Sequence, residues 1–524
     1  TFIAIATVLA ANAFVYHDLL VDYPARAYPW GSDAWGHLYK AEFLLEQIKQ
    51  GNFWPSYFPR WYNGIQLFRY WAPLPYYVLA GMGLICKDIF LAHIWYIIGC
   101  SLLGSISWLA MRKYTGYLPV LIIALLWVIV PDNISVTFSE GNLPRTLIMA
   151  ITPIIVYLAL EIYHGKADAK KQFGFVLLLA VSVLTHAMMG AILAGSICLW
   201  YMITAWFDRK PWTFVVRFLI LSACGILVTS WWLFPALTGG ITSIDSGGIN
   251  EAIRFFPLSK SLNPLLRMKD PEVFYLGLSY AGLLVFGLLT WKSRRSYQKS
   301  ALLIAALFFL ATTTVTSSLY LKLPLHNLLW PQRLTTAGIA LLLLGTVNFD
   351  FNVNRPAFKK LAGVIFILLV PALFIDSYLS HNLIHLREYP QHVARGIETA
   401  ATHEGFKVAA VDLSEFGSMV SYLFSSEFER EQVFGWAWQG AQTSSNIALA
   451  NTAIKSSWYN YALDRLEEFG ATQLLVKRDT INNYSSFTEA ARDKGYQQVF
   501  INDIAAVYSV NRGPYACTAD YKIL

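Results

Sequence analysis

Long apolar runs without a single charge constrain this chain more than any other feature. Two of them are LPVLIIALLWVIV at residues 118–130 and LAGVIFILLVPALFI at residues 361–375. Only 14% of the residues are charged and 56% are hydrophobic, whereas soluble domains carry about 25% charged residues. Backbone polar groups in lipid must be satisfied internally, which helices achieve. The sequence therefore predicts a polytopic α-helical membrane protein.

The basic residues lie in short loops, and this placement predicts the topology. Lys and Arg mark the cytoplasmic side of a membrane protein. We therefore read the net charge of +7 as a topology signal and expect no nucleic-acid partner. The basic loops lie near 112 and at 164–171, 208–210, 292–299 and 354–360. The outer segments are then 17–89, 133–146, 186–188, 237–272, 320–333 and everything after about 382.

Alternation between these loops predicts about eleven membrane spans. They are roughly 1–16, 90–111, 117–132, 147–163, 172–186, 188–206, 213–236, 273–291, 300–319, 334–349 and 361–380. Thr1 already lies inside an apolar run, so we expect the first of them to be part of a membrane helix rather than a signal peptide. Residues 71–87 break the alternation and start with Pro73 and Pro75. We expect a re-entrant or juxtamembrane helix there.

The chain changes character from His385 onwards. Short β-like runs (KVAAVDL, TQLLVK, QQVFIN, AAVYSV) alternate with helix-like segments (YNYALDRLEEFG, SFTEAARDKG). This pattern is typical of a small α/β domain. The predicted organisation is a transmembrane domain at 1–382, with a long first outer loop at 17–89, and an extracytoplasmic α/β domain at 383–524.

The first outer loop holds an acid and two basic groups at helical spacing. Ser32 is a good helix N-cap, and Asp33, His37 and Lys40 then share one face at i, i+4 and i+7. Such a helix can lie in the membrane interface with its polar face towards a cavity. The alternative is that Asp33 is a first-turn acid favoured by the helix dipole.

Further polar groups fall in other predicted outer loops. Glu140 and Arg145 lie in FSEGNLPRTL, His186 in LTHAMMG, and His326 and Arg333 in LHNLLWPQRL. Each of these residues also has a purely structural explanation: a charge that faces water, a structural hydrogen bond or an anchor at the membrane interface. Together they suit a reaction on a lipid-linked phosphate, in which a carboxylate deprotonates an acceptor hydroxyl and cations stabilise the departing phosphate.

Several stretches resemble the GT-C superfamily of membrane glycosyltransferases. Residues 31–78, from GSDAWGHLYK to PLPYYV, resemble the long first outer loop of that superfamily. FSEGN resembles the acid-bearing second loop of the oligosaccharyltransferase catalytic subunit. LHNLLWPQRL, SWWLFPAL, FGWAWQGAQTSSNIALAN and YALDRLEEFGATQLLVKRD resemble the membrane proteins labelled 6-pyruvoyl-tetrahydropterin-synthase-related. No zinc-ligand histidine cluster accompanies that label.

The resemblance implies roles for particular residues. The first-loop catalytic acid falls on Asp33 and the second-loop acid on Glu140. Metal dependence varies in the superfamily, so the resemblance does not imply a divalent ion; if Mg²⁺ or Mn²⁺ binds, Asp33 and Glu140 are its expected ligands. His37, Lys40, Arg145, His186, His326 and Arg333 are the candidate substrate-binding residues. The WWD-type acceptor motif of the oligosaccharyltransferases is absent from the sequence.

Three functions are compatible with these features. The first is an inverting glycosyltransferase of the cytoplasmic membrane, which moves a sugar from a polyprenyl-phosphate donor to an extracytoplasmic glycan, lipid or protein. The second is a transporter of lipid-linked glycans, which the charge-free spans disfavour. The third is a non-catalytic assembly or binding protein with protein partners. In each case the loop at 237–272 is either a mobile lid or a plain connection.

Overall fold

The structure is a computed structural model, and it groups the chain into two compact units. It describes residues 2–513 except for 24–27, 30, 240–253, 271–272, 325, 327–328, 347–355, 385, 388–390, 412–416 and 437–441. Residues 240–253 and 271–272 of the predicted lid at 237–272 thus lie outside the described residues. Unit 1 comprises Thr1–Ala25, Ile94–Leu233 and Ser246–His385, and unit 2 comprises Arg26–His93, Phe234–Asp245 and Leu386–Leu524. This grouping by contact differs from the linear boundary at 382/383, which stays a prediction.

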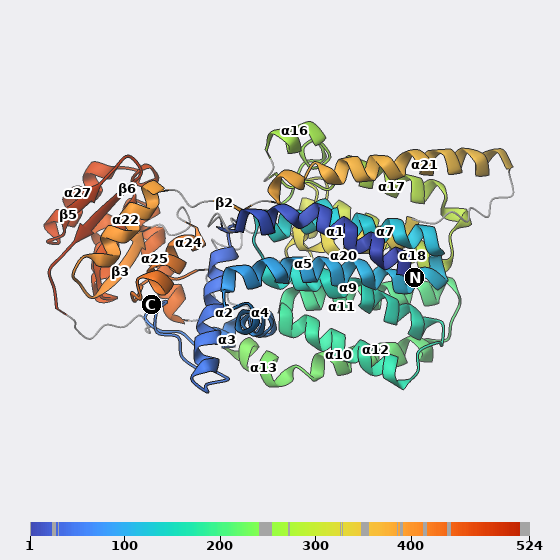
Figure 1. The fold of residues 1–524 in the computed structure, drawn as a ribbon, viewed down its shortest axis with the longest axis horizontal. Coiled ribbons are helices and arrows are strands. Elements are labelled where there is room, and N and C mark those ends of the chain that lie inside the picture. The colour runs from blue at the N-terminus through green and yellow to red at the C-terminus, as the bar shows by residue number, and fades with distance from the viewer. Residues whose placement is uncertain are drawn as a thin grey trace. The chain divides into compact units, whose positions relative to one another are not determined.

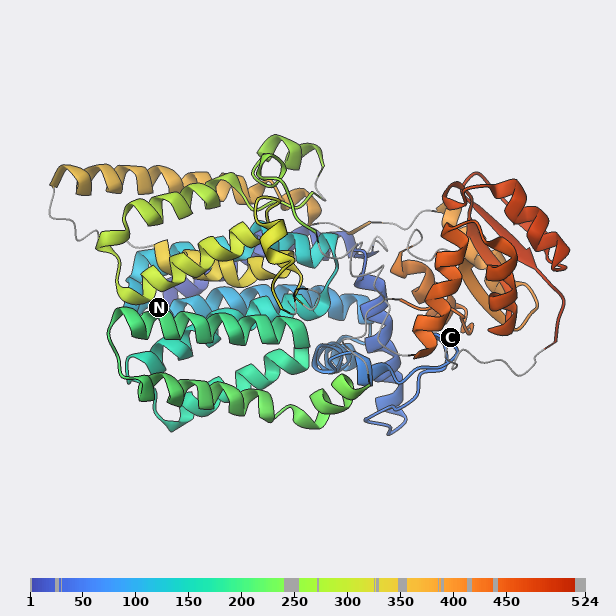
Figure 2. The same cartoon turned by 180° about the vertical axis from the view of Figure 1, so that it is seen from behind.

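Unit 1 is a bundle of apolar helices that run along one another (Figures 1 and 2). Its longer helices are α1 (Phe2–Asp22), α5 (Ile89–Trp108, entering from unit 2), α7 (Tyr117–Ile129), α9 (Leu143–Tyr163), α10 (Ala169–Thr185), α11 (Ala187–Phe207), α12 (Trp212–Leu227), α13 (Ser230–Thr238, continuing into unit 2), α17 (Leu278–Leu289), α18 (Ser296–Ala311), α20 (Thr335–Thr346) and α21 (Pro356–Tyr378). Short helical turns connect them at η2 (Leu109–Met111), α6 (Arg112–Thr115), α8 (Pro131–Ile134), η3 (Ser135–Ser139), α15 (Leu258–Ser261), α16 (Pro264–Lys269), η4 (Trp291–Ser293), α19 (Ser317–Tyr320), η6 (Pro331–Leu334) and η7 (His381–Leu383).

Every predicted span overlaps at least one helix, and 213–236 covers the bent pair α12 and α13, but the number of crossings is not confirmed. Within the described residues, six helices are long and apolar enough to span a membrane, or seven if the bent pair α12 and α13 forms one span. By contrast, α17 and α20 each have 12 residues. A helix of that length is about 18 Å long, against a hydrocarbon core of about 30 Å. The count of about eleven therefore stays a prediction.

Unit 2 joins the first loop to the C-terminal domain. The loop contributes α2 (Ala34–Lys49), α3 (Leu67–Tyr70), the apolar α4 (Leu74–Cys86) and the short β1 (Tyr28–Pro29), which pairs antiparallel with β2 (Leu386–Arg387). The C-terminal part holds α22 (Gln391–Thr402), β3 (Lys407–Val411), α24 (Ser418–Tyr422), η8 (Leu423–Glu427), α25 (Gln442–Lys455), α26 (Tyr459–Glu468), β4 (Ala471–Lys477), η9 (Arg478–Thr480), α27 (Tyr484–Asp493), β5 (Gln497–Ile501) and β6 (Ala505–Ser509).

The C-terminal sheet is sandwiched between helices. Its strand order is β3-β4-β6-β5, with β3 parallel to β4 and the other pairs antiparallel. Side chains alternate between the faces of a strand. A Cβ on Gly396 of α22 would lie 3.2 Å from Leu475, whereas Phe487 of α27 contacts Tyr508, the partner of Leu474. Helices thus cover both faces, and the four predicted strand runs and both helix segments are confirmed.

Glycine allows α18 and α20 to pack closely within unit 1. A Cβ built on Gly345 of α20 would lie 2.8 Å from Leu302 Cγ and 3.0 Å from the Gln298 carbonyl oxygen. The two helices can approach this closely because residue 345 has no side chain, as is common between membrane helices.

Gly345→Ala should therefore force the two helices apart. We expect a loss of roughly 1–3 kcal/mol in the free energy of unfolding, as for overpacked cores, seen as a lower melting temperature in detergent. Gly363→Ala on α21 is the matched control, because a Cβ there meets no atom within 4 Å. Equal melting temperatures for the two variants would contradict this account of the α18–α20 contact.

Candidate active site

The segment before α9 makes a π-helical turn that carries Glu140. The Glu140 N–H donates to the Ser135 carbonyl oxygen, five residues back, at 2.9 Å, and the Asn142 N–H donates to the Val136 carbonyl oxygen at 2.9 Å. Gly141 follows with φ +65°, a conformation that glycine adopts without steric cost. Single π-turns of this kind occur often at functional sites. The turn ends unit 1's α7–η3 segment and starts α9.

Asn142 caps the N-terminus of α9 and places Arg145 in its first turn. The Asn142 side-chain oxygen accepts a hydrogen bond from the Arg145 backbone N–H at 3.1 Å, and Pro144 suits the first turn because it has no N–H to satisfy. The Arg145 side chain is 1% exposed. A buried cation at a helix N-terminus opposes the helix dipole, so it needs an anion beside it.

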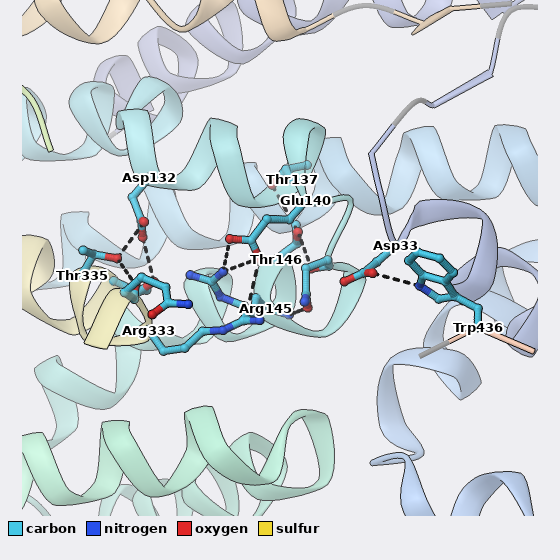
Figure 3. A network of polar contacts seen from close by, with 12 residues as sticks. Asp33, Asp132, Thr137, Glu140, Arg145, Thr146, Arg333, Thr335 and Trp436 are labelled. Atoms are coloured by element: carbon cyan, nitrogen blue, oxygen red, sulfur yellow. Dashed lines mark hydrogen bonds and ion pairs between the residues drawn. The ribbon is translucent and has the colours of Figure 1, made fainter. Parts of the chain in front are cut away.

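Glu140 supplies that anion and shares it with a second arginine. Arg145 Nη1 donates to both Glu140 carboxylate oxygens, at 2.6 and 2.5 Å, and Arg333 Nη1 of η6 donates to Glu140 Oε2 at 3.2 Å (Figure 3). These three residues and His186 are called the Glu140 cluster below. Two guanidinium groups thus share the Glu140 carboxylate.

The charges in this cluster set the protonation of its members. Burial acts to raise the pKa of Glu140, but the charges of Arg145 and Arg333 outweigh it and hold that pKa below the usual value. Burial, and then the charges of Arg333 and Arg145, lower the pKa of His186 to about 3. Glu140 is thus ionised and His186 neutral near pH 7. His186 lies between α10 and α11, where the sequence predicted a tight turn.

Asp132, which the sequence interpretation missed, anchors the start of α20 next to Arg333. Its carboxylate oxygens accept hydrogen bonds from the Thr335 hydroxyl at 2.7 Å and the Thr336 hydroxyl at 2.9 Å (Figure 3). The sequence feature that could have identified Asp132 is an acidic residue at the end of an apolar segment. A further contact, between the hydroxyls of Thr137 and Thr146 at 3.1 Å, ties the π-turn to α9.

Asp33 in unit 2 begins α2, but its carboxylate does not cap that helix. Asp33, rather than the predicted Ser32, occupies the N-cap position and makes no side-chain cap hydrogen bond. Instead, the indole Nε1 of Trp436 donates to Asp33 Oδ1 at 2.9 Å (Figure 3). Nothing in the sequence pointed to Trp436, which is separated from Asp33 by most of the chain.

His37 and Lys40 share a face of α2 as predicted, but that face is buried. His37 and Lys40 are 1% and 0% exposed. His37 Nδ1 lies 2.8 Å from the Tyr76 hydroxyl, and Lys40 Nζ lies 3.6 Å from the centre of the Trp71 ring. Burial lowers the pKa of Lys40 to about 7, against the opposing effect of the Asp33 charge. Both side chains therefore pack inside unit 2, and contact with substrate stays a prediction.

His326 stands apart from the Glu140 cluster in its contacts. Its Nδ1 lies 3.0 Å from the Leu323 carbonyl oxygen, three residues back, which is a local turn contact. The structure thus brings together Glu140, Arg145, Arg333 and the charge-coupled His186 within unit 1, and it places Asp33, His37 and Lys40 on one helix within unit 2.

The surroundings of Glu140 do not suit a divalent cation. Both carboxylate oxygens are engaged by Arg145, and two guanidinium groups would repel a metal ion. In the part of the chain that the structure describes, no group of three or more His, Cys, Asp or Glu side chains is arranged to hold a metal. The predicted Mg²⁺ or Mn²⁺ stays a prediction for Asp33 alone.

Several solved structures share the fold of this chain. The chain superposes on arabinofuranosyltransferase AftD from Mycobacteria with a TM-score of 0.59 at 13% identity, over 98% of this chain and 40% of that one. The Archaeoglobus fulgidus oligosaccharyltransferase, tethered with an acceptor peptide, gives 0.58 at 11% identity, over 98% and 74%. ArnT from Cupriavidus metallidurans, bound to undecaprenyl phosphate, gives 0.51 at 13%, over 97% of both chains. The fold is that of the GT-C membrane glycosyltransferases.

Sequence comparison then identifies the family. The model described as "6-pyruvoyl-tetrahydropterin synthase related domain; membrane protein" matches residues 68–384, and a domain of unknown function (DUF8559) matches residues 392–519. The chain belongs to this family of 6-pyruvoyl-tetrahydropterin synthase related membrane proteins, as its motifs predicted. A search of the curated proteins finds no significant match. The chain spans only 40% of the length of the arabinofuranosyltransferase.

Replacing Glu140 should destabilise unit 1 in a pH-dependent way. In Glu140→Gln, two guanidinium groups lose their shared anion. We expect a loss of about 2 kcal/mol at neutral pH, less than the ~3–5 kcal/mol for a fully buried pair, because solvent screens a side chain that is 36% exposed.

The sign of the pH effect follows from the lowered pKa of Glu140. A carboxylate whose pKa is lower in the folded than in the unfolded state stabilises the fold above its usual pKa, and this stabilisation disappears as the pH falls below it. The difference in melting temperature between wild type and Glu140→Gln should therefore shrink below about pH 4.5. Asp22→Asn at the end of α1 is the control, since Asp22 contacts no arginine among the described residues. A difference that grows on acidification would contradict this assignment.

Proposed function

We propose that this protein is an inverting glycosyltransferase of the cytoplasmic membrane. It moves a sugar from a polyprenyl-phosphate donor to a glycan, lipid or protein on the extracytoplasmic side, where the C-terminal domain also lies. The observation that carries the proposal is the sharing of the Glu140 carboxylate by Arg145 and Arg333 in a chain with the GT-C fold. Guanidinium groups suit the recognition of a phosphate because they can donate two parallel hydrogen bonds to its oxygens.

The two arginines differ in exposure, and we assign them different roles on this basis. The Arg333 side chain is 11% exposed and that of Arg145 is 1% exposed. Arg333 is therefore the proposed phosphate ligand, whereas Arg145 holds Glu140 in place. Neutral His186 adds one hydrogen-bond donor, and Glu140 orients Arg333. Because the pKa of Glu140 is lowered, this carboxylate is a poor proton acceptor, and the role of base falls to Asp33.

The proposed reaction balances with these groups. The acceptor hydroxyl oxygen attacks the anomeric carbon, while the bond from that carbon to the phosphate oxygen breaks. Asp33 takes the hydroxyl proton, and the developing charge on the leaving lipid phosphate is stabilised by Arg333. A single displacement of this kind inverts the anomeric configuration.

The structural neighbours support the donor class more than the acceptor. ArnT from Cupriavidus metallidurans binds undecaprenyl phosphate in its solved structure, and this ligand is a lipid phosphate of the class proposed here. The oligosaccharyltransferase carries an acceptor peptide with an NVT sequon, but the WWD-type motif expected for such an acceptor is absent from this sequence. The proposal therefore does not include a peptide sequon as the acceptor.

Sugar transfer is the direct test. Purified protein in nanodiscs is incubated with a panel of radiolabelled polyprenyl-phosphate sugars and membrane-derived acceptors, with Asp33→Asn beside the wild type. We expect transfer from at least one donor and a loss of roughly 10³-fold or more in the variant, as when a general base is removed. Asp503→Asn, in the C-terminal domain, is the control.

Two outcomes would sink parts of the proposal. Normal turnover by a folded Asp33→Asn variant removes Asp33 as the base. Binding of the lipid phosphate without transfer from any donor favours the binding or transport alternatives over an enzyme.

Binding of polyprenyl phosphate tests the Glu140 cluster separately. We expect Arg333→Met to weaken binding roughly 10-fold or more, because a charge-assisted contact contributes about 1.5–3 kcal/mol. Lys322→Met, an exposed cation of the same loop, should leave affinity unchanged. The measurement is the dissociation constant by thermophoresis in detergent, and equal constants for both variants would reject Arg333 as the phosphate ligand.

A further inference from the structure

Arg267 of α16 is a further buried arginine of unit 1, and its side chain joins three segments of that unit. The residue is 0% exposed. Its Nη1 donates to the Val273 carbonyl oxygen at 2.8 Å. Its Nη2 donates to the hydroxyl oxygens of Ser135 at 2.9 Å and of Ser380 at 3.1 Å. A guanidinium can hold several acceptors at once because its donors lie in a rigid plane. Arg267 therefore connects its own loop to η3 and to η7.

The segment that carries Arg267 is packed on the helix bundle. The Phe256 N–H donates to the Thr312 carbonyl oxygen at 2.9 Å, and the Phe256 ring stacks on that of Phe274 with the ring centres 4.1 Å apart. The Leu276 N–H donates to the Ser261 carbonyl oxygen at 2.9 Å, which joins the two ends of the segment. This part of the predicted lid is thus attached to unit 1 on both sides of α16, and the position of Arg267 is defined by it.

Ser135 is the residue at which Arg267 meets the π-turn. It is the first residue of η3, and its carbonyl oxygen accepts the Glu140 N–H that closes the turn. A serine hydroxyl inside a helix commonly bonds a carbonyl oxygen of the preceding turn, as Ser196 does with Ile192. The Ser135 hydroxyl accepts its hydrogen bond from outside its helix. One residue therefore connects the buried guanidinium to the backbone of Glu140.

The π-turn competes with the ordinary α-helical closure of the same residues. A π-helical hydrogen bond reaches five residues back and is rare in proteins. An α-helical bond reaches four residues back, so the change from one closure to the other would turn the Glu140 side chain about the helix axis. A contact that holds Ser135 against two other segments favours the closure that the structure shows.

We propose that Arg267 is a positioning residue that acts through Ser135 to fix the direction of the Glu140 carboxylate. This direction sets the contacts of Glu140 with Arg145 and Arg333. The inference rests on the proposed function, in which Arg333, oriented by Glu140, binds the donor phosphate. Arg267 thus extends the support of the phosphate site to the outer segment before α17.

The two serine partners of Arg267 provide a matched pair of variants. Ser135→Ala and Ser380→Ala each remove one hydroxyl from the same Nη2, but only Ser135→Ala releases the π-turn. The measurement is the decrease in melting temperature that Glu140→Gln causes at neutral pH in each background. We expect this decrease to be roughly halved in the Ser135→Ala background and unchanged in the Ser380→Ala background, because contacting residues couple whereas distant ones add.

Binding of polyprenyl phosphate is the second readout. We expect the dissociation constant to rise roughly 3-fold or more in Ser135→Ala, within the range of coupling between neighbouring residues, and to stay unchanged in Ser380→Ala. Arg267→Met should reproduce the effect of Ser135→Ala. If the buried arginine proves necessary for folding, the two serine variants alone decide the question.

The outcomes separate this inference from the proposed function. An equal effect of Glu140→Gln in the two serine backgrounds overturns the proposal, whatever the affinities. Equal affinities of Ser135→Ala and wild type, with clear binding by both, overturn it as well and leave the donor site standing. If the wild type binds no polyprenyl phosphate, the proposed donor site fails, and the melting temperatures alone decide whether Arg267 positions Glu140.

Discussion

Glu140 is the carboxylate on which the polar interior of the membrane bundle depends. Its carboxylate connects the π-turn to the first turn of α9 through Arg145. Through Arg333 it also connects both to η6, almost 200 residues further along the chain. A guanidinium buried among apolar helices is costly unless a carboxylate accompanies it. Because Arg145 and Arg333 both bind its carboxylate, Glu140 stabilises two guanidinium groups at once.

In unit 2 the Asp33 carboxylate accepts a hydrogen bond from the Trp436 indole. This hydrogen bond joins two residues that lie 403 positions apart in the sequence. The loop and the C-terminal domain thus form one compact body around α2. The C-terminal domain, which the domain of unknown function matches, therefore contacts Asp33 directly.

Local signals in the sequence predicted the helices and strands well. The break at His186, the strands β3 to β6 and the helix α2 all follow from apolar periodicity and short polar interruptions. The charged members of the Glu140 cluster were also found, because charges are rare in such a chain. The burial of His37 and Lys40 was not predicted, since periodicity shows the faces of a helix but not which distant segments cover them. Trp436 was missed for the same reason, because it contacts Gly36 and Asp33, which lie far from it in the sequence.

The number of residues in the π-turn before α9 determines the direction in which the Glu140 side chain points. In an α-helix each residue turns by about 100° around the axis, whereas here the Glu140 N–H reaches back five residues to Ser135. A chain with one residue fewer between 135 and 139 could close the same turn as a regular α-helix with an almost unchanged apolar pattern. The carboxylate would then point about a quarter-turn away from Arg145 and Arg333. Deletion of one residue, which hardly changes the composition of the segment, would therefore separate Glu140 from both arginines. Insertions and deletions in this turn should be selected against more strongly than conservative substitutions of its apolar residues.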